Sequence, residues 1–217
     1  MTNFNNLIVN KLNHSEMKKA LAIVALIAAM FVAGNVQAQT TINVGYAPET
    51  FSYDNSSHKL QGFYAGLTQN IGLYKGIGVA VGAQFRMNTK NESTTIMGVT
   101  TTGKENQSLI DVPILINYGI TVDPDIIITP FAGPMLTLAL AGNTKYYIGS
   151  SISRTDNWYG DDGDRNRFNL NAVFGANVKF DQLNLHGGYR IGLIDQIKSD
   201  NGTMNTSGFF VGLGYNL

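Results

Sequence analysis

Apolar and polar residues alternate with a period of two along most of the chain beyond residue 40. The clearest case is segment 167–180, where seven apolar side chains occupy every second position and the positions between them are mostly polar or small. This period predicts a strand with one apolar face and one polar face. The same alternation predicts eight strands in all, covering 41–48, 60–70, 76–87, 108–118, 126–140, 167–180, 182–194 and 207–217.

The connections between these strands alternate in length. The first, third, fifth and seventh are long, at 49–59, 89–107, 141–166 and 195–206, whereas those near 71–75, 119–125 and 181 are short. Brief periplasmic turns and longer external loops are typical of an outer-membrane barrel, and a soluble β-sandwich has no reason to sort its loops in this way. We therefore predict an all-β, eight-stranded antiparallel up-and-down transmembrane β-barrel with a periplasmic N-terminus.

The N-terminal segment has the pattern of a secretory signal. A basic stretch at 17–19 precedes the apolar run 20–33, and Val36, Gln37 and Ala38 form a small-x-small cleavage site. That apolar run is too short for a comfortable membrane span and has the length of a signal peptide. We expect a cleavable helical signal peptide over 1–38, with Met17 as the candidate true start, followed by a barrel domain over 39–217.

Composition agrees with an exported barrel of one domain. Only 14% of the 217 residues are charged, 44% are hydrophobic and 24 are glycine, which suits a wall that meets lipid. No cysteine is present, which excludes disulfides, thiolate metal sites and a lipid-modified N-terminal cysteine. The formal net charge is zero and no basic stripe occurs, so nucleic acid is not an expected partner.

Three segments resemble the small outer-membrane β-barrel family of Bacteroidetes that includes the PorT-like proteins. They are 110–119 (IDVPILINYG), 129–134 (TPFAGP) and the glycine-rich last strand, which ends in Tyr215, Asn216 and Leu217. The resemblance implies an eight-stranded barrel without catalytic residues, in which the C-terminal strand 207–217 is recognised by the barrel-assembly machinery. The chain departs from this family at Leu217, since such barrels often end in an aromatic residue.

Polar side chains on the inward parity are expected to fill the lumen, because eight strands enclose a space just wide enough for side chains. Arg86 and Arg190 need acidic partners there, and Asp111 is the nearest by parity, so we hypothesise an Arg86–Asp111 pair as an internal strut. The expected structural network consists of Arg86, Asp111, Asn117, Asn171, Lys179, His186 and Arg190.

The third long connection holds the richest loop chemistry. Its candidate interaction residues are Asp156, Trp158, Tyr159, Asp161, Asp162 and Asp164. The acids have the hard oxygen ligands that calcium prefers, but the twelve-residue calcium-loop pattern is missing, so solvated turn acids are expected and no metal site is predicted. Trp158 and Tyr159 are interpreted as an exposed pair that contacts a glycan, a partner or lipid, or as part of the membrane interface.

Catalysis has little support in the sequence. His58 lies beside Ser56 and Ser57 with Asp54 nearby, but neighbours in one loop rarely form a triad, and His186 has no serine at a suggestive spacing. We expect no enzyme, no catalytic residues and no cofactor.

The predicted function is that of a small integral outer-membrane protein with a side-chain-filled lumen. Its role would be non-enzymatic, in the envelope or in surface-loop interaction such as adhesion, assembly or secretion support. Outer-membrane lipid and an extracellular ligand or protein are the expected partners. An outer-membrane enzyme and a narrow channel are the alternatives.

Overall fold

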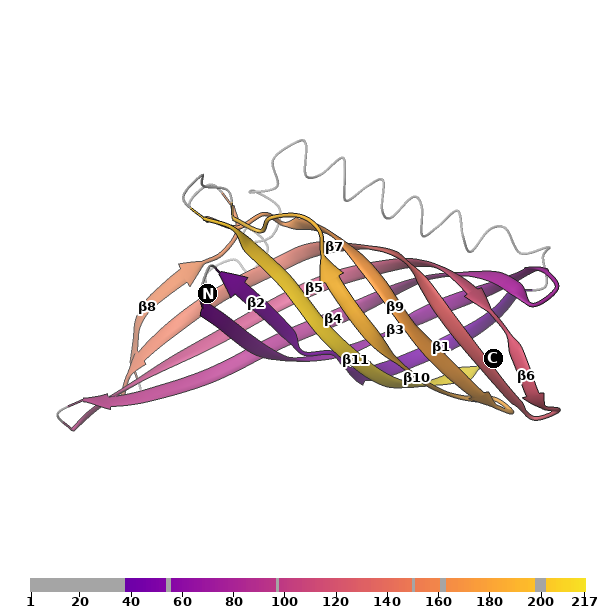
Figure 1. Cartoon of the computed structure of the whole chain (residues 1–217). Helices are drawn as coiled ribbons and strands as arrows, with labels where there is room; N and C mark the ends of the chain where they lie inside the picture. The colour runs from indigo at the N-terminus through magenta and orange to yellow at the C-terminus, as the bar shows by residue number, and fades with distance from the viewer. Residues whose placement is uncertain (1–37, 54–55, 97, 150, 161–162, 198–201) are drawn as a thin grey trace, which may run out of the picture.

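The protein is a closed antiparallel β-barrel (Figure 1). The structure, a computed structural model, describes residues 38–53, 56–96, 98–149, 151–160, 163–197 and 202–217. The predicted signal peptide therefore lies outside the described residues, except for Ala38, where the first strand begins. Among the described residues, no helix is long and apolar enough to cross a membrane.

The described strands are β1 (Ala38–Tyr46), β2 (Glu49–Tyr53), β3 (Ser56–Tyr74), β4 (Ile77–Ile96), β5 (Val99–Tyr118), β6 (Ile120–Asp123), β7 (Ile126–Ile148), β8 (Ser151–Asn157), β9 (Phe168–Phe180), β10 (Leu183–Gly192) and β11 (Met204–Asn216). They occupy eight positions in the wall, because β2 continues β1 while β6 and β8 pair only with β7. The ring closes where β1 pairs with β3 on one side and β11 on the other. The predicted eight-stranded fold is confirmed.

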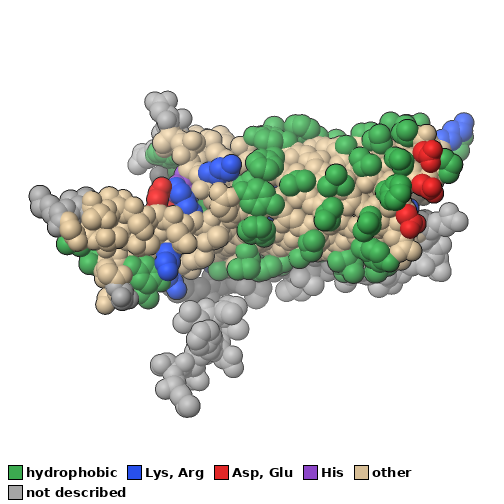
Figure 2. Space-filling model, turned by 90° about the horizontal axis from the view of Figure 1, so that it is seen from below, with side chains coloured by type: hydrophobic (Ala, Val, Ile, Leu, Met, Phe, Trp, Pro, Cys, Tyr) green, Lys and Arg blue, Asp and Glu red, His purple; other side chains and the backbone are tan. Residues whose placement is uncertain are grey.

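Side chains alternate between the lumen and the outer surface as the sequence pattern predicts. In β9, Asn169, Asn171 and Val173 are buried, whereas Phe174 and Phe180 on the opposite parity are exposed. Figure 2 shows outward apolar side chains gathered in a broad band across the visible face of the wall, with charged side chains at both ends. Such a band is the surface that hydrocarbon contacts.

Three of the predicted long loops are mostly strand, and the first of them, 49–59, holds β2 and the start of β3. Segment 89–107 is a hairpin in which β4 and β5 stay paired as far as Ile96 and Val99, and the first part of 141–166 is the β7–β8 hairpin. β4 and β5 have 20 residues each and β7 has 23, about twice what a tilted strand needs to cross a bilayer. We call the protruding sheet, residues 88–96, 98–107, 141–149 and 151–157, the wing. It extends from the barrel at the end opposite the short turns, the long-hairpin end (Figure 1).

The opposite end has short turns, as predicted. Lys75 and Gly76 join β3 to β4, and both have positive φ, at 45° and 84°. Positive φ at both central residues is the signature of a type I′ turn, whose twist matches the strands of a hairpin. We refer to this as the short-turn end of the barrel.

Candidate functional site in the barrel interior

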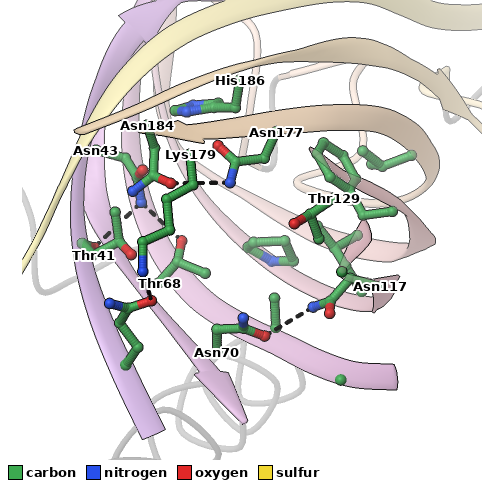
Figure 3. Close-up of a pocket in the computed structure, with 18 of the residues that line it drawn as sticks. Thr41, Asn43, Thr68, Asn70, Asn117, Thr129, Asn177, Lys179, Asn184 and His186 are labelled. Carbon is green, nitrogen blue, oxygen red and sulfur yellow. Dashed lines mark hydrogen bonds between the residues drawn. The ribbon is translucent and has the colours of Figure 1, made fainter. Parts of the chain in front are cut away.

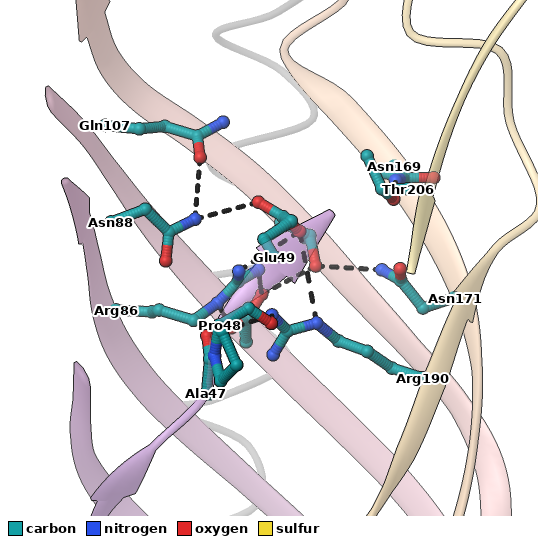
Figure 4. A network of polar contacts seen from close by, with 12 residues as sticks. Ala47, Pro48, Glu49, Arg86, Asn88, Gln107, Asn169, Asn171, Arg190 and Thr206 are labelled. Atoms are coloured by element: carbon teal, nitrogen blue, oxygen red, sulfur yellow. Dashed lines mark hydrogen bonds and ion pairs between the residues drawn. The ribbon is translucent and has the colours of Figure 1, made fainter. Parts of the chain in front are cut away.

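A buried ion network crosses the lumen between the two ends (Figure 4). Arg86 on β4 donates to Asp111 on β5 through Nε at 2.7 Å and Nη2 at 3.2 Å. Its Nη1 lies 3.1 Å from Oε1 of Glu49 on β2. All three side chains are at most 5% exposed. The predicted Arg86–Asp111 pair is therefore present, and Glu49 joins it.

Arg190 completes the charge balance of this network. Its Nε lies 3.9 Å from Glu49, and its Nη2 donates to the carbonyls of Ala47 and Pro48 at 3.1 and 2.8 Å. These two residues separate β1 from β2, and Pro48 has no N–H for a ladder. Arg190 thus supplies donors to backbone carbonyls at the break in the first wall strand. Two arginines face two carboxylates, which is how buried charges are tolerated.

Glu49 was not predicted to lie in the lumen, because Pro48 was taken as the end of the first strand and 49–59 as a loop. The sequence signal that could have placed Glu49 in the lumen is its parity along the strand. Asn43, Ala47, Glu49 and Phe51 occupy alternate positions and all are buried.

From Glu49 a chain of amides leads toward the long-hairpin end. Asn88 donates to Glu49 at 2.8 Å and to Gln107 at 2.7 Å, and Gln107 donates to the Tyr159 hydroxyl at 2.6 Å. Burial raises the pKa of the Tyr159 phenol to about 12. In the other direction, Thr137 donates to Asp111 at 2.6 Å, and Asn171 donates to Thr137 at 3.0 Å. The polar groups named here form one connected system.

An aromatic cluster closes the long-hairpin end. It consists of Phe51, Leu60, Leu109, Ala139, Trp158, Tyr159 and Met204. The Arg165 guanidinium lies 4.0 Å from the centre of the Trp158 ring, and Trp158 Nε1 donates to Thr144 at 2.8 Å. The prediction of an exposed Trp158–Tyr159 pair is wrong, since their exposed fractions are 5% and 8%. Both rings fold inward because the mouth of the barrel offers an apolar surface together with polar partners for the indole and the phenol.

The short-turn half of the lumen is hollow, which corrects the expectation of a lumen filled by side chains. It contains a cavity of about 530 Å³. The predicted lumen residues Asn117, Lys179 and His186 line this cavity (Figure 3). Asn117 donates to Asn70 at 2.9 Å, and Lys179 donates to Gln39 at 3.3 Å. The seven predicted network residues are thus divided between the ion network and the cavity wall.

Of the candidate acids in the third long connection, Asp156 and Asp164 are described. Asp156 pairs with Arg154 on β8, and Asp164 is exposed. Asp161 and Asp162 lie outside the described residues. In the described part of the chain, no group of three or more His, Cys, Asp or Glu side chains is placed to hold a metal ion.

The two histidines of the described residues, His58 and His186, have partners other than serine. His58 Nε2 lies 2.6 Å from Glu105, and Lys90 donates to His58 Nδ1 at 3.1 Å. The Ser56 hydroxyl donates to the Tyr53 carbonyl instead of His58. His186 Nε2 shares a hydrogen bond with the Tyr64 hydroxyl inside the lumen.

Replacing Arg86 with Met tests the ion network. The substitution leaves the Glu49 and Asp111 carboxylates buried with their main countercharge removed, so we expect a loss of about 3–5 kcal/mol in unfolding free energy. Urea-induced unfolding of the barrel in lipid vesicles measures this loss. Arg154→Met is the matched control, because it removes an exposed pair and should change the free energy by less than about 1 kcal/mol. Equal effects of the two substitutions would contradict the role of the network.

Replacing Gly142 with Ala tests the aromatic closure. A Cβ at this position would lie 2.6 Å from the Tyr159 ring and 2.8 Å from the Trp158 ring, so the rings must move. Because Trp158 is the single tryptophan of the chain, its fluorescence emission should shift to longer wavelength. Gly103→Ala is the control within the wing, since its Cβ would approach nothing closer than 3.9 Å. An unchanged spectrum in Gly142→Ala would refute tight packing of the cluster.

Comparisons with known proteins agree with this architecture. A family model described as outer membrane protein beta-barrel domain matches residues 27–198. No curated protein matches the sequence. Among solved structures, Ail of Yersinia pestis in complex with the heparin analogue sucrose octasulfate has a TM-score of 0.51 at 12% identity, covering 84% of this chain and 100% of that one.

Two further structures have lower scores. A second structure of Ail has a TM-score of 0.49 at 12% identity, with the same coverage of both chains. Neisserial surface protein A has a TM-score of 0.44 at 14% identity, covering 83% of this chain and 99% of that one. With a family model matched over most of its length, the chain belongs to the outer membrane protein beta-barrel domain family and is a small outer-membrane β-barrel protein.

Proposed function

We propose that this barrel is a non-enzymatic surface protein whose wing faces the cell exterior and binds a polyanionic ligand. The observation that carries the proposal is the wing itself. Four strands continue well beyond the apolar band as a paired sheet, so the protein holds a rigid surface away from the membrane. A sheet of this size is not needed to anchor a barrel, which supports an interaction role.

The two faces of the wing differ in charge. Lys104 on β5 lies directly opposite Lys145 on β7, on the face that continues the outer wall of the barrel. Like charges directly opposite each other destabilise a sheet. A bound anion would therefore reduce the electrostatic repulsion between the two lysines. The described carboxylates of the wing all have the opposite parity: they are Glu92, Glu105 and Asp156.

The neighbours of this lysine pair are suitable for a glycan. Asn91 and Thr155 flank the pair across the sheet, and Lys104 Nζ lies 4.9 Å from the centre of the Tyr147 ring. Amides, hydroxyls and a ring accompany the two cations. A sulfated or phosphorylated saccharide fits this chemistry, and the heparin analogue bound to Ail suggests a suitable probe.

Features of the interior favour this surface role over the enzyme and channel alternatives. His58 is held between Glu105 and Lys90 at the outer rim, and its hydrogen-bond partners in the described chain include no serine. The ion network and the aromatic cluster occupy the long-hairpin half of the lumen, which supports a barrel that does not conduct. Bilayer conductance of the purified barrel would contradict this part of the proposal.

The proposal includes an orientation and an assembly route. We place the short-turn end and the N-terminus in the periplasm after removal of residues 1–38, with β11 as the signal read by the barrel-assembly machinery. β11 closes the ring against β1, which agrees with a role late in assembly. Membership of the PorT-like group, and with it a role in secretion support, stays a prediction of the resemblance.

Single-cysteine variants test the orientation, because the native chain has no cysteine. Thr95→Cys lies near the tip of the wing, and Gln182→Cys lies in the β9–β10 turn; both positions are exposed. A membrane-impermeant maleimide added to intact cells should label Thr95→Cys and leave Gln182→Cys unlabelled until the outer membrane is permeabilised. The reverse pattern would overturn the orientation.

Binding of sucrose octasulfate tests the ligand class. The purified barrel in detergent should bind it, and Lys104→Gln and Lys145→Gln should each weaken binding several-fold, because each removes one cation from the pair. Lys90→Gln is the charge-matched control on the opposite face of the wing, and its effect should be small. Equal weakening by all three variants would indicate a response to net charge alone and would contradict a defined site, as would absence of binding.

A further inference from the structure

The cavity in the short-turn half of the lumen is shaped like a ligand site. Its volume of about 530 Å³ lies within the range of about 300–1,000 Å³ that is typical of small-molecule sites. One end opens among the turn residues Lys75 and Gly76, and the other end is closed by Arg86, Asp111 and Arg190. The lining residues therefore place an entrance at the short-turn end.

Side-chain amides and hydroxyls line this cavity in an ordered arrangement (Figure 3). Asn177 donates to Asn184 at 3.0 Å, and Asn184 donates to Asn216 at 2.7 Å. On the neighbouring wall, Asn43 donates to Thr68 at 3.0 Å. These mutual bonds hold the amides in place, so a ligand would meet fixed donors and acceptors rather than mobile side chains.

Lys179 is the cation that this arrangement leaves without a countercharge. Among the described residues, its hydrogen-bond partner is the neutral Gln39 side chain, at 3.3 Å. Asp111 is the single carboxylate among the residues that line the cavity, and it is already paired with Arg86. A ligand with an anionic group would supply the negative charge that Lys179 lacks in the cavity wall.

Aromatic rings occupy one side of the same cavity. Phe131 and Phe210 are stacked with centroids 6.3 Å apart, and His186 lies beside Phe210 at 6.5 Å. A ring face combined with fixed amides and hydroxyls matches the C–H and O–H groups of a sugar. An extended peptide would need a free strand edge, and the described ladders of the barrel wall are closed here.

We infer that the cavity binds a small acidic saccharide, with Lys179 contacting the acidic group and the amides contacting the hydroxyls. The volume limits the ligand to about one or two sugar units. This site is separate from the wing, and only the periplasmic source of its ligand rests on the orientation proposed above.

Glucuronate and glucose form a matched pair of probes, because they share a ring and differ in one carboxylate. The purified full barrel in detergent should bind glucuronate about tenfold more tightly than glucose, since one charge-assisted hydrogen bond is added. Binding is followed by NMR chemical-shift changes of the lining amides. Lys179→Met should remove the preference for glucuronate while leaving the barrel folded, as judged by heat-modified migration on gels.

Gly72→Phe is a second variant that keeps the charge and blocks the space. Gly72 lines the cavity, and a Cβ there would meet nothing within 4 Å, so the larger side chain can enter the hollow without a clash. It should abolish binding of both sugars. The Lys104→Gln/Lys145→Gln double variant is the control for the wing, and it should bind glucuronate as the native protein does.

The outcomes of these binding experiments distinguish the cavity site from the wing. No binding of glucuronate at millimolar concentration, or binding that survives both Lys179→Met and Gly72→Phe, would overturn the cavity site. Loss of glucuronate binding in the wing double variant would assign the sugar to the wing instead. Neither result bears on sucrose octasulfate binding, so failure of the cavity site and failure of the proposed function are distinguishable.

Discussion

Closure of the ring is the constraint on which the rest of the structure depends. In hydrocarbon every backbone N–H and C=O must be paired within the protein, and β1 meets this requirement by pairing with both β3 and β11. Once eight strands close, one face of every strand contacts lipid and the other faces a narrow interior. The period-two pattern of the sequence follows from this requirement.

The narrow interior in turn determines how charge is arranged. The Arg86 side chain is buried, so its charge is stable there only with Asp111 and Glu49 around it. Glu49 reaches the lumen because the first wall strand resumes after Pro48, and Arg190 donates to the carbonyls at that break. The same group of residues thus supplies hydrogen bonds at the break in the first wall strand and balances the buried charges.

Sequence reasoning predicted what depends on strand parity. Counting alternate positions along the predicted strands was enough to predict which side chains of β9 face outward. The same count placed Arg86 and Asp111 together in the lumen. The wing was missed because its threonine-, asparagine- and lysine-rich segments have the composition of loops. A signal was present: the cross-strand pairs Thr94–Thr101 and Thr95–Thr100 join β-branched residues, which favour strands.

The burial of Trp158 had no such local signal. Its ring is placed by Thr144, Arg165 and Phe51, which come from three separate segments of the chain. A contact assembled from distant segments has no period and no fixed spacing, so it emerges only when the fold is closed. The cavity is a further case, since it depends on how far inward side chains from every wall strand extend.

The ion network also separates the two ends of the molecule. The residues proposed to bind at the wing, Lys104 and Lys145, have other partners in the described chain than Lys179 and the amides of the cavity. Between the two lies a rigid layer of paired charges and aromatic rings whose groups have one another as partners. Changes at sites far apart and without shared partners are generally additive. A barrel built in this way can change the chemistry of one end while the other keeps its structure, which suits a protein that meets two different compartments.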